Sequence, residues 1–188
     1  ITEDYNKSLQ DYSEQLSSGN VELNSLQNQL DSVKKEKESL ETRLSQVSGA
    51  DGNNKLLTAV IKAANLYISN DSTGAAEAIA DVDVSSLPVE EAKTLYNTIS
   101  GATMMNAAND LYNRGMTAYN KADYTTAADL LVRAYKCDKT KADAVFYAAK
   151  SYVALNQPDN AKKYYQIIAD EFKSSGYVTE AQAYVQSH

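Results

Sequence analysis

The residues that could carry out covalent chemistry are few in this chain. The one histidine, His188, is the last residue, so a Ser–His or Cys–His pair would have to form at a fraying end. The one cysteine, Cys137, lies near the end of a predicted helix, where we expect a buried and unreactive thiol. Neighbouring acids such as Glu90 and Glu91 are typical of a solvated helix face. Because phosphate loops, zinc motifs and calcium loops are also missing from the sequence, we expect no enzyme, cofactor or metal.

The overall composition predicts an all-α fold and argues against several kinds of partner. Eighteen Lys and Arg against 25 Asp and Glu give a formal net charge of −7, spread along the chain. No segment gathers the positive charge that nucleic acid or an anionic membrane surface attracts. Seven glycines, two prolines and no tryptophan leave too few turn residues for a fold of many short strands. The expected activity is therefore binding to a protein or peptide.

Residues 1–47 carry an apolar heptad repeat. With Leu9 as position a, most a and d positions are Leu, Val or Tyr, and the other positions are mainly polar. This 3.5-residue period predicts a left-handed coiled coil, because a lone helix cannot bury such a stripe. We expect a homo-oligomer, with a parallel dimer favoured and a trimer as the alternative. The expected oligomerisation seam consists of Leu9, Leu16, Leu23, Leu26, Leu30, Val33, Leu40 and Leu44.

Residues 17–20 (Ser-Ser-Gly-Asn) are the weak point of this rod. Gly19 costs about 1 kcal/mol relative to alanine inside a helix and removes a d side chain. One alternative is a hairpin turn that folds residues 2–16 back onto 21–47. The heptad register passes through Gly19 without a phase shift, which favours a continuous helix.

Residues 48–53 (Ser-Gly-Ala-Asp-Gly-Asn) are expected to form a linker, since they combine two glycines with polar turn formers. Residues 54–188 would then form a second, helical domain. No uncharged stretch is apolar enough to span a membrane. The sequence starts with Ile1 rather than Met, and we expect that a preceding segment was removed; a membrane would be involved only if that segment was an anchor.

An internal repeat is found in the C-terminal part at a shift of 34 residues. It pairs Leu111 with Val145, Gly115 with Ala149, Ala127 with Ala161, Leu131 with Tyr165 and Ala134 with Ile168. The small side chains at Gly115, Ala149, Ala127 and Ala161 are expected to let two antiparallel helices pack closely.

This pattern resembles the tetratricopeptide repeat (TPR) over residues 108–173. The resemblance implies a right-handed α-solenoid of antiparallel helix pairs, with repeats at 108–141 and 142–175 and a capping helix at 176–186. Lys139 replaces the usual terminal proline, and Pro158 stands at a normally aromatic position. Further helices are expected at 56–69, 73–82 and 88–100, with Gly101 breaking the last one or bending it into 103–122.

In TPR proteins the first helix of each pair lines a groove that binds a protein segment. The groove residues that the resemblance implies are Asn109, Tyr112, Asn113, Met116, Tyr119, Phe146, Tyr147 and Lys150. Only Lys150 is cationic, which disfavours a clamp for a terminal carboxylate. Tyrosine and amide side chains suit an extended, apolar segment, and Tyr112, Tyr147 and Lys150 are the strongest candidates for partner contact. Alternatively, the chain's own helices fill the groove.

The order of parts, a coiled coil followed by TPRs, is similar to that of the periplasmic cell-division coordinators that work with the Tol–Pal system. The resemblance implies an oligomeric scaffold or adaptor at the bacterial cell envelope, outside the cytoplasm, with a cytoplasmic location as the alternative. The alternative function is a structural spacer or stalk whose helical domain packs on itself and binds no ligand.

Overall fold

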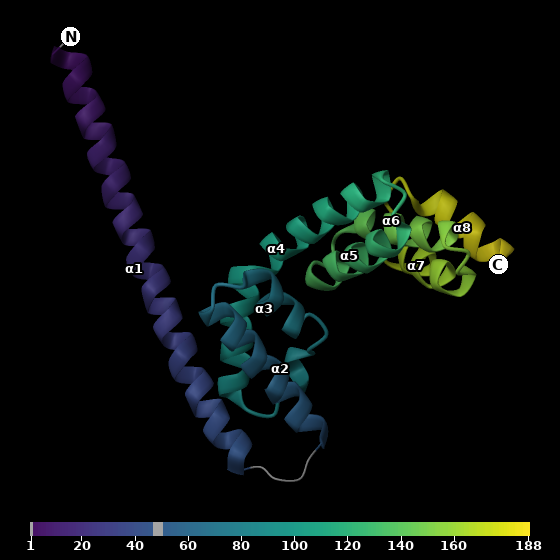
Figure 1. Cartoon of the computed structure of the whole chain (residues 1–188), viewed down its shortest axis with the longest axis horizontal. Coiled ribbons are helices and arrows are strands. Elements are labelled where there is room, and N and C mark those ends of the chain that lie inside the picture. Colours follow the sequence, from purple (N-terminus) through teal and green to yellow (C-terminus); the bar gives the residue numbers. More distant parts are fainter. Residues whose placement is uncertain (1, 47–50) are drawn as a thin grey trace.

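The computed structural model describes the backbone of residues 2–46 and 51–188, and the side chains of residues 7–42 and 55–188. Its regular elements in these ranges are all helical, which confirms the predicted all-α class (Figure 1). In chain order they are α1 (Thr2–Gln46), α2 (Asp51–Ile68), α3 (Ser72–Ile79), the 3-10 helix η1 (Val84–Ser86), α4 (Glu90–Asn120), α5 (Tyr124–Cys137), α6 (Ala142–Ala154), α7 (Pro158–Glu171) and α8 (Val178–Ser187).

Helix α1 is continuous through Gly19, so the alternative of a hairpin turn at residues 17–20 is wrong. Its 45 residues span about 68 Å, at about 1.5 Å per residue. Figure 1 shows that its N-terminal half extends away from the rest of the molecule, whereas its C-terminal half lies beside α2.

The C-terminal half of α1 belongs to a hydrophobic core that also includes α2, α3 and the first half of α4. We call this core the N-terminal cluster; its fully buried members include Val33, Leu40, Val60, Ala63, Ile79, Leu95 and Ile99. Residues 1–47 are therefore not a rod separate from the helical domain. The expected linker also differs, because α2 begins at Asp51 and residues 51–53 are helical; residues 47–50 lie outside the described part of the chain.

Helix α4 joins the two halves of the molecule. Of the two alternatives at Gly101, a break is wrong, because the helix runs through that residue without interruption. The other alternative, a helix that bends into residues 103–122, is the one observed (Figure 1). Figure 1 shows that α4 changes direction between the half beside α3 and the half beside α5. The buried Thr103 hydroxyl donates to the Ile99 carbonyl at 2.7 Å, a bond that is typical of bent helices. Met104 packs against the cores on both sides of this bend.

The second core, the C-terminal cluster, is built by the second half of α4 and by α5–α8, each packed against the next along the chain. All five residue pairs of the 34-residue repeat are buried in both copies. Gly115 is required by the closeness of α5, because a Cβ at this position would lie 2.8 Å from Cγ of Leu131. The four small residues expected at helix crossings, Gly115, Ala127, Ala149 and Ala161, are thus inside the core.

The same turn ends α2, α4 and α6. The second residue after each of these helices has a left-handed backbone, with φ of 64° at Asn70, 59° at Ala122 and 55° at Asn156. In the turn after α4, the Asp123 N–H donates to the Ala118 carbonyl at 3.0 Å, and equivalent bonds close the other two turns. This is the Schellman arrangement that satisfies the last carbonyls of a helix. Three helix pairs, α2–α3, α4–α5 and α6–α7, are therefore built on one local plan.

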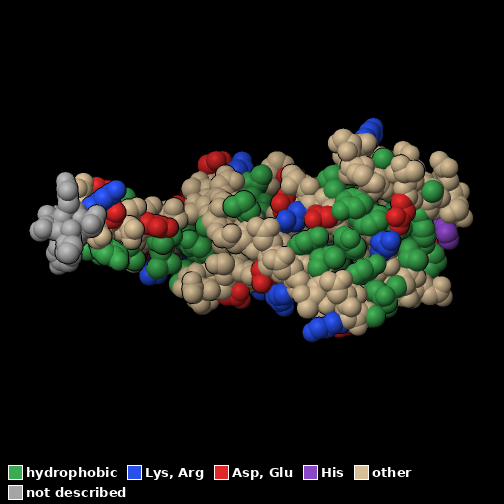
Figure 2. Space-filling view, turned by 90° about the horizontal axis from the view of Figure 1, so that it is seen from above, with side chains coloured by type: hydrophobic (Ala, Val, Ile, Leu, Met, Phe, Trp, Pro, Cys, Tyr) green, Lys and Arg blue, Asp and Glu red, His purple; other side chains and the backbone are tan. Residues whose placement is uncertain are grey.

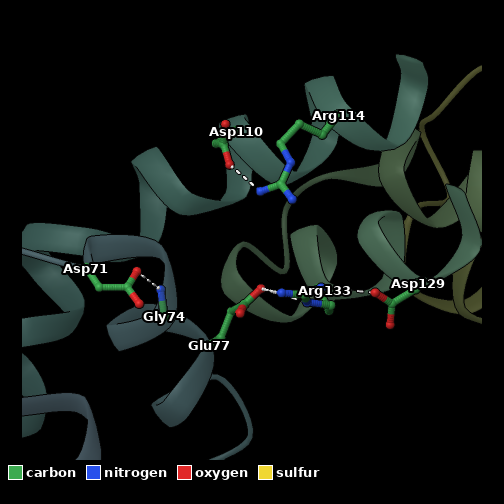
Figure 3. A network of polar contacts seen from close by, with 7 residues as sticks. All are labelled: Asp71, Gly74, Glu77, Asp110, Arg114, Asp129 and Arg133. Carbon is green, nitrogen blue, oxygen red and sulfur yellow. Dashed lines mark hydrogen bonds and ion pairs between the residues drawn. The ribbon is translucent and has the colours of Figure 1, made fainter. Parts of the chain in front are cut away.

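Ion pairs connect α3 and the turn after it to α5 across the junction of the two clusters. Figure 3 shows the one between Glu77 and Arg133. The Arg133 Nε donates to Glu77 Oε1 at 2.7 Å, and the same guanidinium pairs with Asp129 at 3.0 Å. One turn further along, Lys136 Nζ lies 2.6 Å from Asp81 Oδ2. These links help to fix α3 against the C-terminal helices.

Candidate interaction surfaces

The N-terminal half of α1 exposes a stripe of large apolar side chains to solvent. We call it the projecting stripe; the exposed fractions are 50% for Leu9, 69% for Tyr12, 70% for Leu16, 64% for Leu23 and 50% for Leu26. Figure 2 shows hydrophobic side chains along one side of this part of the helix. Among the described residues, these side chains stay at least half exposed, whereas those of the core are buried.

The rest of the expected seam lies inside the molecule. Val33 and Leu40 are fully buried in the N-terminal cluster, and Leu30 is half-buried. The expectation of a single intermolecular seam is therefore wrong for Val33 and Leu40, because α2 and α4 pack on this side of α1. The side chain of Leu44 lies outside the described residues.

A hollow of about 470 Å³ lies where the projecting stripe reaches the core. Leu26 and Leu30 of α1 form one wall, Tyr67 and Ile68 at the end of α2 form another, and Ala102 of α4 contributes as well. Sequence analysis missed this site, because its walls come from three helices that are far apart in the sequence.

The expected groove residues lie on α4 and α6, which the Tyr119 and Tyr147 rings bring into contact. We call these residues the aromatic–amide face; they are Asn109, Tyr112, Asn113, Met116, Tyr119, Phe146, Tyr147 and Lys150. The Tyr119 and Tyr147 rings meet edge to face, with centroids 5.2 Å apart. Asn109 and Asn113 are exposed, whereas Met116 is half-buried. The aromatic–amide face therefore combines half-buried tyrosine rings with exposed amide side chains.

Tyr112 is partly engaged by α6 and the turn before it. Burial, followed by the nearby carboxylate of Asp143, raises the pKa of the Tyr112 hydroxyl to about 12. The Lys141 ammonium lies 5.5 Å from the centroid of the same ring. The ring thus helps to hold α4 against α6 while leaving part of its surface open.

The C-terminal helix covers the α6 end of the aromatic–amide face. The Tyr177 ring stacks on Phe146 with centroids 4.2 Å apart, and only 6% of Phe146 remains exposed. Glu180 Oε1 lies 3.4 Å from Lys150 Nζ and also accepts a hydrogen bond from the Tyr165 hydroxyl at 3.2 Å. Phe146 and Lys150 are therefore occupied by the chain's own residues, as the self-packing alternative expects, and Lys150 is not a free cation for a partner.

A second hollow, of about 260 Å³, lies between α5 and α7, on residues that the sequence did not single out. Its walls are Val132, Tyr135, Lys136, Lys139, Lys163, Tyr164 and Ile167. Lys139 and Lys163 lie over aromatic rings, at 4.4 Å from the centroid of Tyr135 and 5.4 Å from that of Tyr164. Because Lys136 already pairs with Asp81, this hollow has less free positive charge than its three lysines suggest.

The two residues with potentially reactive side chains, Cys137 and His188, both pack against other parts of the chain. Cys137 is buried as predicted, and burial raises the pKa of its thiol to about 11, so the thiolate is scarce at neutral pH. The His188 ring stacks on Tyr184 with centroids 4.2 Å apart. Across the described residues, no three His, Cys, Asp or Glu side chains are placed to hold a metal ion. None of the helices in the described ranges has the length and apolar character needed to cross a membrane.

Searches against protein-family models, curated proteins and solved structures found no match to this chain.

Proposed function

We propose that this protein is a non-enzymatic adaptor for protein–protein interaction. In this proposal the projecting half of α1 self-associates as a coiled coil and sets the oligomeric state. Helices α4–α8 form a TPR-like, right-handed solenoid that presents the aromatic–amide face to a peptide or protein segment.

The projecting stripe is the observation that carries this proposal. Fully burying one leucine side chain is worth about 1.5–3 kcal/mol, and the stripe leaves four leucines and a tyrosine at least half exposed. A single helix in water gains little stability from such a stripe, whereas two paired helices bury it in both copies. Self-association therefore accounts for apolar residues that the monomer leaves in solvent.

The repeated turns and buried repeat positions support the solenoid part of the proposal. Helix pairs with the same Schellman turn and the same small residues at their crossings can stack side by side, each burying one face on the next. The open part of the aromatic–amide face, around Asn109, Asn113 and Met116, then offers amide donors and acceptors beside apolar surface to an extended segment.

Light scattering on the whole chain tests the self-association. We expect a dimer for the wild-type chain and a monomer for Leu23→Asn, because that substitution places an amide in the stripe. Val21→Asn is the matched control, since Val21 is 68% exposed on the same helix but lies off the stripe. A wild-type monomer, or equal effects of both substitutions, would contradict this part of the proposal.

Affinity capture with surface variants tests the aromatic–amide face. The double variant Asn109→Lys and Asn113→Lys changes two exposed side chains and is expected to lose bound partners while keeping its melting temperature. Asn28→Lys, at an exposed asparagine of α1, is the control for added charge. Unchanged capture by the double variant argues against this face as the binding surface.

The alternative function, a spacer without a ligand, is favoured by one observation. Tyr177 and Glu180 already occupy Phe146 and Lys150, so part of the face serves to dock α8. If the double variant and the wild-type chain both dimerise and capture no partner, the spacer becomes the better description.

A further inference from the structure

The two halves of α1 constrain how two copies can pair. The stripe that is exposed from Leu9 to Leu26 continues into Val33 and Leu40, which are fully buried against the chain's own helices. Helices α2 and α4 therefore occupy the stripe side of α1 from about Leu30 onward. A partner helix lying on the projecting stripe meets this core at its base.

A parallel pair conflicts with this placement. In a parallel coiled coil the second α1 would continue alongside the first beyond Leu30, into the space that α2 and α4 fill. The two cores would also lie at the same end of the coil, each on the side that faces the other helix. An antiparallel pair places the two cores at opposite ends, so that only the N-terminal end of each α1 meets the core of the other copy.

We propose that two copies of this chain pair through their projecting stripes as an antiparallel coiled coil, with the two-fold axis passing between Leu16 and Gly19. This inference rests on the proposed self-association and specifies its geometry. It replaces the parallel dimer that the heptad pattern alone favoured.

The spacing of the stripe matches this register. In antiparallel pairing an a position of one helix faces a d position of the other, so Leu9 faces Leu26 of the second copy and Tyr12 faces Leu23 of the second copy. At the centre, Leu16 faces Gly19 of the second copy. Apart from the neighbouring residues and backbone of its own helix, nothing lies within 4 Å of a Cβ built on Gly19, so there is room here for the leucine. In a parallel register the two glycines would face each other and leave a gap in the seam.

Charge does not favour either a parallel or an antiparallel pairing of two α1 helices, so the direction depends on how their shapes fit. The positions beside the projecting stripe are mainly hydroxyl and amide side chains, such as Ser13, Gln15, Asn20 and Gln27, with Glu22 as the acidic exception. Neither orientation therefore gains a set of interhelical ion pairs.

The hollow at the base of the stripe completes the interface. The paired segment from residue 9 to 26 is only about 26 Å long, at about 1.5 Å per residue, and so short a coil is marginal by itself. In the antiparallel dimer the N-terminal end of each α1 reaches the hollow that Leu30, Tyr67 and Ala102 of the other copy line. Each dimer thus buries two such hollows in addition to the coil.

Cysteine cross-linking between two populations of whole chain tests the direction. Leu9→Cys is prepared without a tag and Leu26→Cys with a mass tag, and the buried Cys137 is kept in both. After oxidation we expect the mixture to form a disulfide-linked pair of mixed mass. Neither variant should cross-link alone, because two copies of the same residue would lie about 26 Å apart.

The outcomes separate the inference from the proposal on which it rests. A wild-type monomer in light scattering removes the self-association itself. A wild-type dimer whose Leu9→Cys and Leu26→Cys variants each cross-link alone overturns the antiparallel direction only. A dimer without a mixed-mass product overturns the proposed register, and a trimer overturns the two-fold pairing.

A second variant tests the hollow. Ala102→Glu places a charge in the hollow on an exposed position and is expected to weaken dimerisation at least tenfold, with no change in the melting temperature of the diluted chain. Asn97→Glu, at an exposed position on another side of α4, is the matched control. Equal dimer affinity for both variants overturns docking in the hollow.

Discussion

Apolar side chains are covered at the C-terminal end of this molecule and exposed at its N-terminal end. At the C-terminal end, α8 packs against α7, the Tyr177 ring stacks on Phe146, and the centroid of the Tyr184 ring lies 4.7 Å from that of Tyr165. At the N-terminal end, Leu16 and Leu23 extend from the core on a bare helix. In the proposed solenoid α8 caps the C-terminal end, whereas the projecting stripe is the surface that we propose binds a second copy.

The same contrast exists within α1. One heptad stripe supplies both Leu40, which stabilises the chain's own core, and Leu16, which the monomer leaves exposed. The heptad period therefore identifies which residues of α1 form an apolar stripe. Whether the chain itself buries a given residue of the stripe depends on how the distant helices α2 and α4 pack.

The largest expected effect separates the two halves of α1. Leu40→Ala should lower the free energy of unfolding by about 2–5 kcal/mol, because it leaves a cavity among fully buried side chains. Leu16→Ala should change the unfolding of the diluted monomer by less than about 0.5 kcal/mol. Urea denaturation at low protein concentration measures both values. Similar losses for the two variants would contradict the division of the stripe.

The next prediction compares two glycines of α4. Gly115→Ala should lower the free energy of unfolding by about 1–3 kcal/mol, since its Cβ would meet Leu131 at 2.8 Å. Gly101→Ala should raise it by about 0.5–1 kcal/mol, because the new methyl group meets nothing within 4 Å and alanine favours the helix. Thermal denaturation should therefore show shifts of opposite sign. A loss of stability in both variants would mean that α4 needs Gly101 for its bend.

The packing of α8 at the C-terminal end is tested by removing the Tyr177 ring. Tyr177→Ala should lower the free energy of unfolding by about 1–2 kcal/mol, because it deletes the ring stacked on Phe146. Tyr12→Ala removes a tyrosine from the open end and should leave the diluted monomer unchanged. Urea denaturation of both variants distinguishes a docked α8 from one that adds no stability.

Alkaline pH should lower the free energy of unfolding through Tyr135 of α5, which bonds to Glu171 of α7. Burial and then the bond to Glu171 raise the pKa of Tyr135 to about 12, above its value in the unfolded chain of about 10. The unfolded state therefore loses this proton first, and the stabilising contribution is complete below pH 10 and is lost as the pH rises towards 12, with a slope of at most about 1.4 kcal/mol per pH unit. Tyr135→Phe should flatten this part of the stability profile. An unchanged profile would show that Tyr135 does not contribute to it.

The smallest effect concerns the shared turn of the three helix pairs. Ala122 has the left-handed backbone that Asn adopts at the equivalent positions 70 and 156, and this conformation is unfavourable for alanine. Ala122→Asn should raise the free energy of unfolding by about 0.5 kcal/mol, and Asn156→Ala should lower it by a similar amount. Differential scanning calorimetry on the two variants measures the pair of shifts, and shifts of the same sign would contradict the common turn.

Local patterns predicted most of the helices. Helices α5–α8 follow from apolar periodicity and from turn and cap residues that are close in sequence, such as Asp123, whose carboxylate accepts from the Thr126 N–H. The start of α2 at Asp51 was not predicted, because two nearby glycines indicated a linker. The sequence left open whether Gly101 breaks α4 or bends it, and packing on both sides of Gly101 outweighs the low helix propensity of glycine.

The candidate surfaces were less predictable than the helices. Tyr112 and Tyr147 were found by their spacing within a repeat, and the structure brings the two helices that carry them together. The roles of Tyr177 and Glu180 in covering Phe146 and Lys150 depend on where α8 docks, which no local pattern specifies. The hollow beside Leu26 and Ala102 was missed for the same reason.

Hydrogen exchange of α1 as a function of protein concentration tests the division of its stripe most directly. We predict that backbone amides around Val33 and Leu40 are protected at every concentration, whereas those between Leu9 and Leu26 gain protection only as the dimer forms. Protection of the segment from Leu9 to Leu26 that does not change with concentration would contradict the account.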